Sequence, residues 1–159
     1  MISTKTIQLL TFRIQQEELS SRIYEQMSLW LANKGYKGAS AVWAMFSKEE
    51  LEHAQKAKDF LLSFGLLPEL SALEEPENVF KDISDIINKT YEHEVTITNQ
   101  CNELAKYAIE KEIVLLPLAL SYVEIQVKEM EEVTDLKDIL ALSSDKLVLD
   151  EYLKKTFLD

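Results

Sequence analysis

Apolar positions recur in steps of three and four residues along four long stretches of the chain. These stretches run from Leu10 to Leu31, from Trp43 to Phe64, from Ile83 to Ala108 and from Leu115 to Leu140. Such spacing places the apolar side chains on one face of an α-helix. The chain of 159 residues has only three glycines and three prolines, which also favours long helices. The pattern therefore predicts an all-α fold.

The segments between these helices differ in length. Asn33–Gly35 and the polar residues Glu110–Glu112 predict short turns after the first and third helices. Gly65–Asn78 contains two prolines and no helical pattern, so we expect it to cross the length of the bundle. The result is a four-helix bundle with one long crossover, between the second and third helices. We expect one domain, residues 1–159, with the bundle at about 5–141.

The C-terminal segment, about residues 144–157, predicts a short fifth helix capped by Ser144 or Asp145. A helix this short is not stable alone, so we expect its apolar face to be buried against the bundle or at a subunit junction. Pro117 is tolerated in the first turn of the fourth helix, so we expect that helix to start later than Ile113. Ser40 or an earlier residue is expected to cap the second helix.

Composition narrows the class of protein. A net charge of −11 argues against a nucleic-acid partner, because binding phosphates requires a basic face. No apolar run is long enough to span a membrane, and the N-terminal residues lack the pattern of a signal peptide. The single cysteine, Cys101, lies on an apolar stripe and is expected to be a buried packing residue. We therefore predict a cytoplasmic protein without a membrane partner.

Polar residues interrupt the apolar stripe of every long helix. They are Glu17 on the first, Glu50 and His53 on the second, Glu94 on the third, and Gln126 and Glu129 on the fourth. A buried carboxylate costs several kcal/mol unless its charge is offset. Four carboxylates that converge inside one bundle therefore predict a bound metal.

The two halves of the chain repeat this pattern. Glu17 precedes Glu50 by 33 residues, and Glu94 precedes Gln126 by 32. Each half has a helix with one glutamate, followed by a helix with two polar residues three apart, which points both to one side. This predicts two metal ions side by side, bridged by Glu50, with four carboxylates balancing two divalent charges. Oxygen ligands with one imidazole favour iron or manganese over structural zinc.

Two further residues lie close to these positions. Tyr24 is two turns from Glu17 on the same stripe, so it is either a core aromatic or a hydrogen-bond donor to a ligand, and a possible electron source. His93 lies one position off the stripe beside Glu94, and we do not expect it to be a ligand.

Four segments, SSRIYEQMS, KEELEHAQK, TYEHEVTIT and YVEIQVKE, resemble the helices of the non-haem bacterial ferritins. The resemblance implies a first iron site at Glu17, Glu50 and His53, and a second at Glu50, Glu94 and Glu129. It also implies that Gln126 and Tyr24 adjoin the dinuclear iron, and we count Gln126 among the expected metal ligands. Members of this family form shells of 24 subunits that oxidise Fe(II) with oxygen or hydrogen peroxide and store the ferric mineral.

Three positions depart from related patterns. Glu52 stands where bacterioferritins carry a haem-ligating methionine, so we predict no haem. Ile125 and Lys128 stand where the resemblance implies extra glutamates of a third iron site, which leaves only Glu49 of that cluster. We therefore expect the third site to be absent or impaired.

Two alternative functions remain open. One is a di-iron or manganese oxidase of an organic substrate, which needs an open pocket beside the metals. The bulky neighbours Tyr24, Phe46 and Tyr122 leave no obvious space for such a pocket. The other is a shell protein with a vestigial metal site, although the complete ligand set counts against this.

Overall fold

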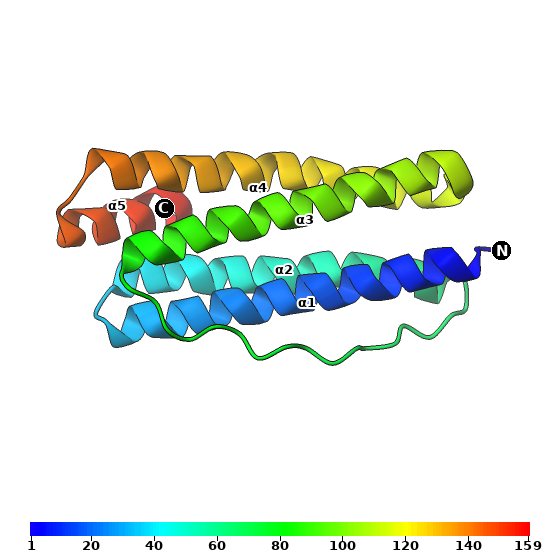
Figure 1. The fold of residues 1–159 in the computed structure, drawn as a ribbon, viewed down its shortest axis with the longest axis horizontal. Helices are drawn as coiled ribbons and strands as arrows, with labels where there is room; N and C mark the ends of the chain where they lie inside the picture. Colours follow the sequence, from blue (N-terminus) through cyan, green and yellow to red (C-terminus); the bar gives the residue numbers. More distant parts are fainter.

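A computed structural model describes residues 1–159 and confirms the all-α fold. The helices, drawn in Figure 1, are α1 (Thr4–Asn33), α2 (Lys37–Ser63), α3 (Ile83–Lys111), the short 3₁₀ helix η1 (Ile113–Leu115), α4 (Leu116–Leu142) and α5 (Lys146–Leu158). None of them has an apolar stretch long enough to traverse a bilayer.

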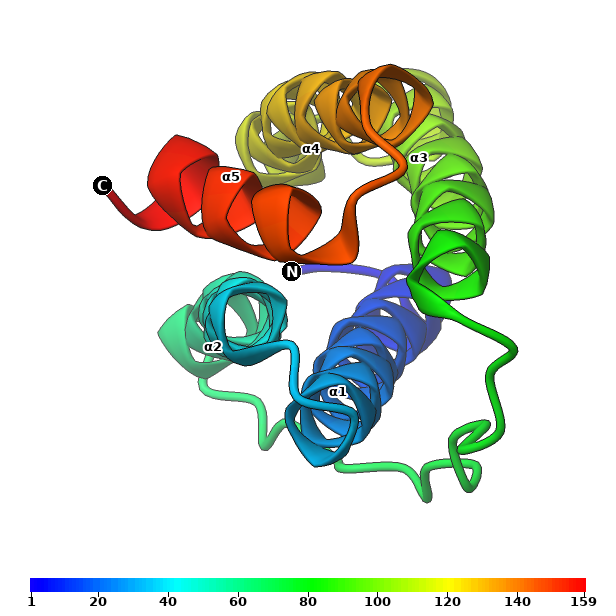
Figure 2. The same ribbon diagram turned by 90° about the vertical axis from the view of Figure 1, so that its left-hand side faces the viewer.

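The four long helices form two hairpins. α1 packs along α2, α3 packs along α4, and the two hairpins face each other around a shared core, as the end-on view in Figure 2 shows. Residues 64–82 form the crossover, which runs along the outside of the bundle from one end to the other (Figure 1). This confirms the single-crossover bundle. The connection continues past Asn78 to Asp82, and α3 starts at Ile83, the first residue of the expected apolar stretch.

Local sequence explains most of the helix ends. Ser3 caps α1 by accepting a hydrogen bond from the backbone N–H of Thr6, and Asp82 caps α3 in the same way through Asp85. Gly35 and Gly65 follow α1 and α2 with φ angles of 92° and 72°, the left-handed region that favours glycine after a helix.

The fourth helix begins where the proline allows it. The 3₁₀ turn η1 ends at Leu115 and α4 starts at Leu116, so Pro117 lies in the first turn. Its missing N–H would have had no partner inside the helix. The later start expected from the sequence is confirmed.

The fifth helix packs on α2 and α4 of its own chain. Asp145 caps α5 by accepting from the backbone N–H groups of Leu147 and Val148. Leu149 and Leu153 are buried against the bundle, whereas Leu147 is 79% exposed. α5 therefore buries one apolar face internally and leaves part of its other face uncovered.

The apolar core of the bundle is divided into two parts. One surrounds Trp43 and includes Leu31 and residues of α5, and the other includes Leu10, Leu61 and Cys101. Cys101 is fully buried as predicted, and burial raises the pKa of its thiol to about 12. A layer of polar side chains lies between the two parts.

Candidate metal centre

The polar layer consists of the residues that interrupt the helical stripes. α1 contributes Glu17, α2 contributes Glu50 and His53, α3 contributes Glu94, and α4 contributes Gln126 and Glu129. All are buried except His53, whose side chain is 12% exposed. Packing of the apolar residues above and below fixes the helices in register, and this brings the six side chains together.

The ligand atoms form two groups of three that share one carboxylate. Glu17, Glu50 and His53 place ligand atoms within 4.8 Å of one another, and so do Glu50, Glu94 and Glu129. A carboxylate shared by two such groups can bridge two ions. Glu50 therefore occupies the position expected of a bridging ligand.

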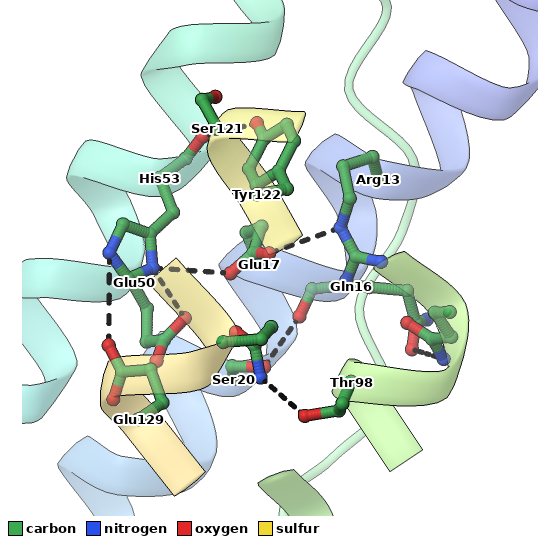
Figure 3. Close-up of polar contacts among 12 residues, drawn as sticks. Arg13, Gln16, Glu17, Ser20, Glu50, His53, Thr98, Ser121, Tyr122 and Glu129 are labelled. Atoms are coloured by element: carbon green, nitrogen blue, oxygen red, sulfur yellow. Dashed lines mark hydrogen bonds and ion pairs between the residues drawn. The ribbon is translucent and has the colours of Figure 1, made fainter. Parts of the chain in front are cut away.

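His53 contacts carboxylates on three helices, as Figure 3 shows. Its Nδ1 lies 3.2 Å from Glu50 Oε2 and 3.7 Å from Glu17 Oε2. Its Nε2 lies 3.9 Å from Glu129 Oε1. The imidazole therefore sits at the centre of the acidic groups, where a ring nitrogen and the surrounding oxygens can ligate the same ion.

Glu94 is held by two neutral donors. The Tyr24 hydroxyl donates to Glu94 Oε1 at 2.5 Å, and Gln126 Nε2 donates to Glu94 Oε2 at 3.0 Å. Gln126 Nε2 also donates to Thr98 Oγ1 at 3.0 Å. In this arrangement Gln126 orients Glu94, and its direct ligation of a metal stays a prediction. Tyr24 fits both interpretations, since it is a buried core aromatic and its hydroxyl also donates to Glu94.

Burial changes the protonation of the carboxylates. It raises the pKa of Glu50 and Glu94 above the ordinary value, and with the nearby charge of Glu94 it raises the pKa of Glu129 to about 9. Burial also acts to raise the pKa of Glu17, but contacts with His53 and Glu50 and the charge of Arg13 bring it down to about 2. Divalent cations would displace the retained protons, since carboxylates bind metal in their ionised form.

The structure adds a residue that the sequence analysis missed. Arg13, one turn before Glu17 on α1, is only 2% exposed, and its Nε lies 3.1 Å from Glu17 Oε1 (Figure 3). The spacing of four residues was the only signal in the sequence, and arginine on a helix is usually exposed.

A third acidic group lies beside the pair. Glu49, Glu129 and Glu132 also place ligand atoms within 4.8 Å of one another. Glu132 is a second residue that the sequence analysis missed, and the absence or impairment of a third iron site stays a prediction. Lys128 Nζ lies 3.6 Å from Glu132 Oε1 and partly offsets the charge of this group.

His93 belongs to none of these groups. Its Nε2 hydrogen-bonds to Ser20 Oγ at 2.7 Å, and its ring packs edge-on against Tyr24. Burial lowers the pKa of His93 to about 4, so the ring is neutral at ordinary pH. His93 is therefore a partly buried histidine whose ring lies against Tyr24.

The polar layer has the properties of a divalent-cation site. Glu17 Oε2 is buried and accepts no well-formed hydrogen bond, whereas Oε1 pairs with Arg13. Buried polar atoms in native proteins usually have partners, so a buried carboxylate oxygen without one is a candidate metal ligand. Four carboxylates, one imidazole and no thiolate suit iron or manganese.

The chain is similar to known proteins over most of its length. Residues 7–142 match the family of ferritin-like domains. A probable bacterial non-heme ferritin-like protein of Haemophilus influenzae is 34% identical over 70% of this chain and 67% of its own length. A bacterial non-heme ferritin of Escherichia coli is 33% identical over 69% of this chain and 66% of its own length.

Solved structures extend the similarity over the whole fold. An open-pore ferritin from the archaeon Archaeoglobus fulgidus superposes with a TM-score of 0.92 at 33% identity, covering 97% of this chain and 98% of its own. An engineered closed form of the same ferritin gives a TM-score of 0.91 at 31% identity, covering 97% of each chain. The chain belongs to the ferritin family.

Proposed function

We propose that this protein is an iron-storage ferroxidase, which oxidises Fe(II) at a dinuclear site within each subunit and stores the ferric product. The observation that carries the proposal is the pair of ligand groups that share Glu50 inside the bundle. Family membership and the names of the relatives, non-heme ferritins of bacteria, support the same function.

Each residue has a role in this reaction. Glu17, Glu50 and His53 bind one Fe(II), and Glu50, Glu94 and Glu129 bind the other. Each Fe(II) loses one electron, and one oxygen molecule takes both electrons with two protons to give hydrogen peroxide. The carboxylates balance the added charge, and the two neutral donors to Glu94 hold it in position.

Storage requires an enclosed space, which one bundle cannot supply. We infer a hollow shell of 24 identical subunits, supported by the close structural similarity to ferritins. The exposed apolar residues of α5, such as Leu147 and Val148, are suited to contact a neighbouring subunit. We further infer that each subunit is one domain that works in the cytoplasm.

Oxidation of an organic substrate fits the structure less well. Tyr24 packs edge-on against Phe46 with ring centroids 6.0 Å apart, and both are buried beside the polar layer. These rings occupy space that an organic substrate would need next to Glu94 and Glu50. A small oxidant such as oxygen or peroxide needs no such space.

The test combines the mass of the native particle with its reaction with Fe(II). We expect a large particle that consumes oxygen with Fe(II) and retains the ferric product after gel filtration. A small oligomer that turns over an organic substrate would support the oxidase instead. A large particle without accelerated Fe(II) oxidation would indicate a shell protein with a vestigial site.

A further inference from the structure

Arg13 is the only lysine or arginine that is buried in this chain. It reaches the bundle interior from α1 and pairs with Glu17 through Nε, yet Nε and Nη2 both lack a well-formed hydrogen bond. A buried guanidinium is costly unless it is paired and fully hydrogen-bonded. An apolar side chain of similar size would fill this space at a lower cost, so packing alone does not explain the arginine.

The charges at the site indicate what the guanidinium does. Four carboxylates and Arg13 carry a formal charge of −3 when all are ionised, counted from Glu17, Glu50, Glu94, Glu129 and the guanidinium. Two divalent ions would bring the total to +1, whereas without Arg13 the loaded site would be neutral. The arginine therefore opposes the binding of the second divalent charge.

The positive charge of Arg13 acts more strongly on one of the two ligand groups than on the other. The contact of Arg13 is with Glu17, in the group that includes His53. Glu17 directs Oε1 to the guanidinium, which leaves Oε2, 3.7 Å from His53 Nδ1, as the oxygen free for a metal. In the other group Glu94 is held by Tyr24 and Gln126, which carry no charge.

We propose that Arg13 is a positioning residue that makes the ion at Glu17 and His53 the weakly held member of the pair. It limits Glu17 to one ligand oxygen and places a permanent positive charge beside that ion. The ion at Glu94 and Glu129 then loads first, and the ion at Glu17 is the one that exchanges readily. This inference rests on the proposed dinuclear site.

Zinc titration of the assembled protein tests the inference without redox chemistry. We expect the wild-type protein to bind two Zn(II) per subunit in two separate steps. Arg13→Gln should tighten the weaker step by roughly tenfold or more, because a unit charge beside a divalent ion is removed from a poorly screened site. Arg22→Gln, which removes the other arginine of α1 at an exposed position, should leave both steps unchanged.

Crystals soaked with less than one Zn(II) per subunit identify which ion is weak. In the wild-type protein we expect zinc at Glu94 and Glu129 alone, and in Arg13→Gln at both groups. Arg13→Met, which keeps the bulk without the charge, should behave like Arg13→Gln and provides a second variant if the first does not assemble.

Two results would overturn the inference. If neither variant tightens the weaker step, or if wild-type zinc occupies the Glu17 group first, Arg13 does not weaken that ion. A wild-type subunit that binds no pair of zinc ions would instead refute the proposed dinuclear site, and the inference with it. The two failures are therefore distinguishable.

Discussion

The hydroxyl of Tyr24 on α1 donates a hydrogen bond to Glu94 on α3, joining the two hairpins of the bundle at the polar layer. The donor is fully buried, and burial with the charge of Glu94 raises the pKa of Tyr24 well above its ordinary value. The hydroxyl therefore keeps its proton and remains a hydrogen-bond donor. With one proton to donate, it holds a single oxygen of Glu94, Oε1. Mutation of a residue that hydrogen-bonds to a metal ligand typically lowers metal affinity or activity about 10–100-fold.

Tyr24→Phe should slow Fe(II) oxidation by about tenfold while the fold is kept, because the ring still packs against Phe46. Stopped-flow absorbance of the ferric product measures the rate. Tyr91→Phe is the matched control, since no hydrogen bond of the Tyr91 hydroxyl is present and its ring lies under Lys137. Equal rates in the two variants would show that the contact with Glu94 is irrelevant to oxidation.

Glu50→Gln should abolish rapid Fe(II) oxidation, because it removes the carboxylate shared by both ligand groups. The same change should raise the melting temperature of the metal-free protein under conditions that ionise Glu50, since an amide cannot repel the buried carboxylates of Glu17, Glu94 and Glu129. Oxygen uptake and calorimetry in the presence of a chelator measure the two effects.

Glu52→Gln provides the control for this charge change on α2, because Glu52 is exposed. Glu52→Gln should change neither the rate of Fe(II) oxidation nor the melting temperature of the metal-free protein. Oxidation at the wild-type rate in Glu50→Gln would refute the assigned bridging role.

Hydrophobic periodicity was sufficient to predict the four helices and the polar layer. An acidic residue at a core position, such as Glu94, stands out because its neighbours three and four residues away are apolar. Arg13 gave no such signal, since charged residues beside a stripe are normally solvated. Arg13 is buried beside Glu17 only because of how the helices pack in the assembled bundle, and this packing leaves no pattern in the sequence.

The start of α2 also depends on a contact that the local sequence does not reveal. Ser40 was a candidate cap, but α2 begins at Lys37 and its N-cap position, Tyr36, has no side-chain hydrogen bond. The free N–H groups are satisfied by Asp150, 112 residues beyond Gly38. A cap that comes from a distant helix leaves no pattern near the helix it caps.

The stability of the metal-free protein should rise as the pH falls from about 9 to about 5. Glu129 has a pKa of about 9 in the folded protein and near 4.5 when unfolded, so the folded state binds more protons in this window. Glu50 and Glu94 act in the same direction. Glu17, with a pKa of about 2, acts oppositely, but its contribution is lost only below about pH 4.5.

Chemical denaturation at several pH values in the presence of a chelator measures this slope. Glu129→Gln should reduce the slope without abolishing it, because it removes one of the three carboxyl groups of the polar layer whose pKa is raised. Saturating Zn(II) should reverse the slope, since metal binding is stronger when the carboxylates are ionised. A metal-free protein whose stability increases with pH across this window would contradict the assignment of retained protons.

Docking of α5 should depend on Asp150, whose carboxylate accepts hydrogen bonds from the backbone N–H groups of Gly38 at 3.0 Å and Ala39 at 2.7 Å. Asp150→Ala should destabilise the attachment of α5 by about 1–2 kcal/mol, the usual cost of a lost helix cap. Gly38→Ala should act similarly, because a Cβ there would lie 2.5 Å from the Asp150 backbone oxygen.

Limited proteolysis followed by mass spectrometry measures the release of α5, and native mass measures the effect on the shell. Both variants should be cleaved faster between α4 and α5 than the wild-type protein. Asp138→Asn, at an exposed position of α4, controls for the loss of one carboxylate and should not change cleavage. Cleavage at the wild-type rate with an intact shell in Asp150→Ala would mean that burial of Leu149 and Leu153 alone holds the fifth helix in place.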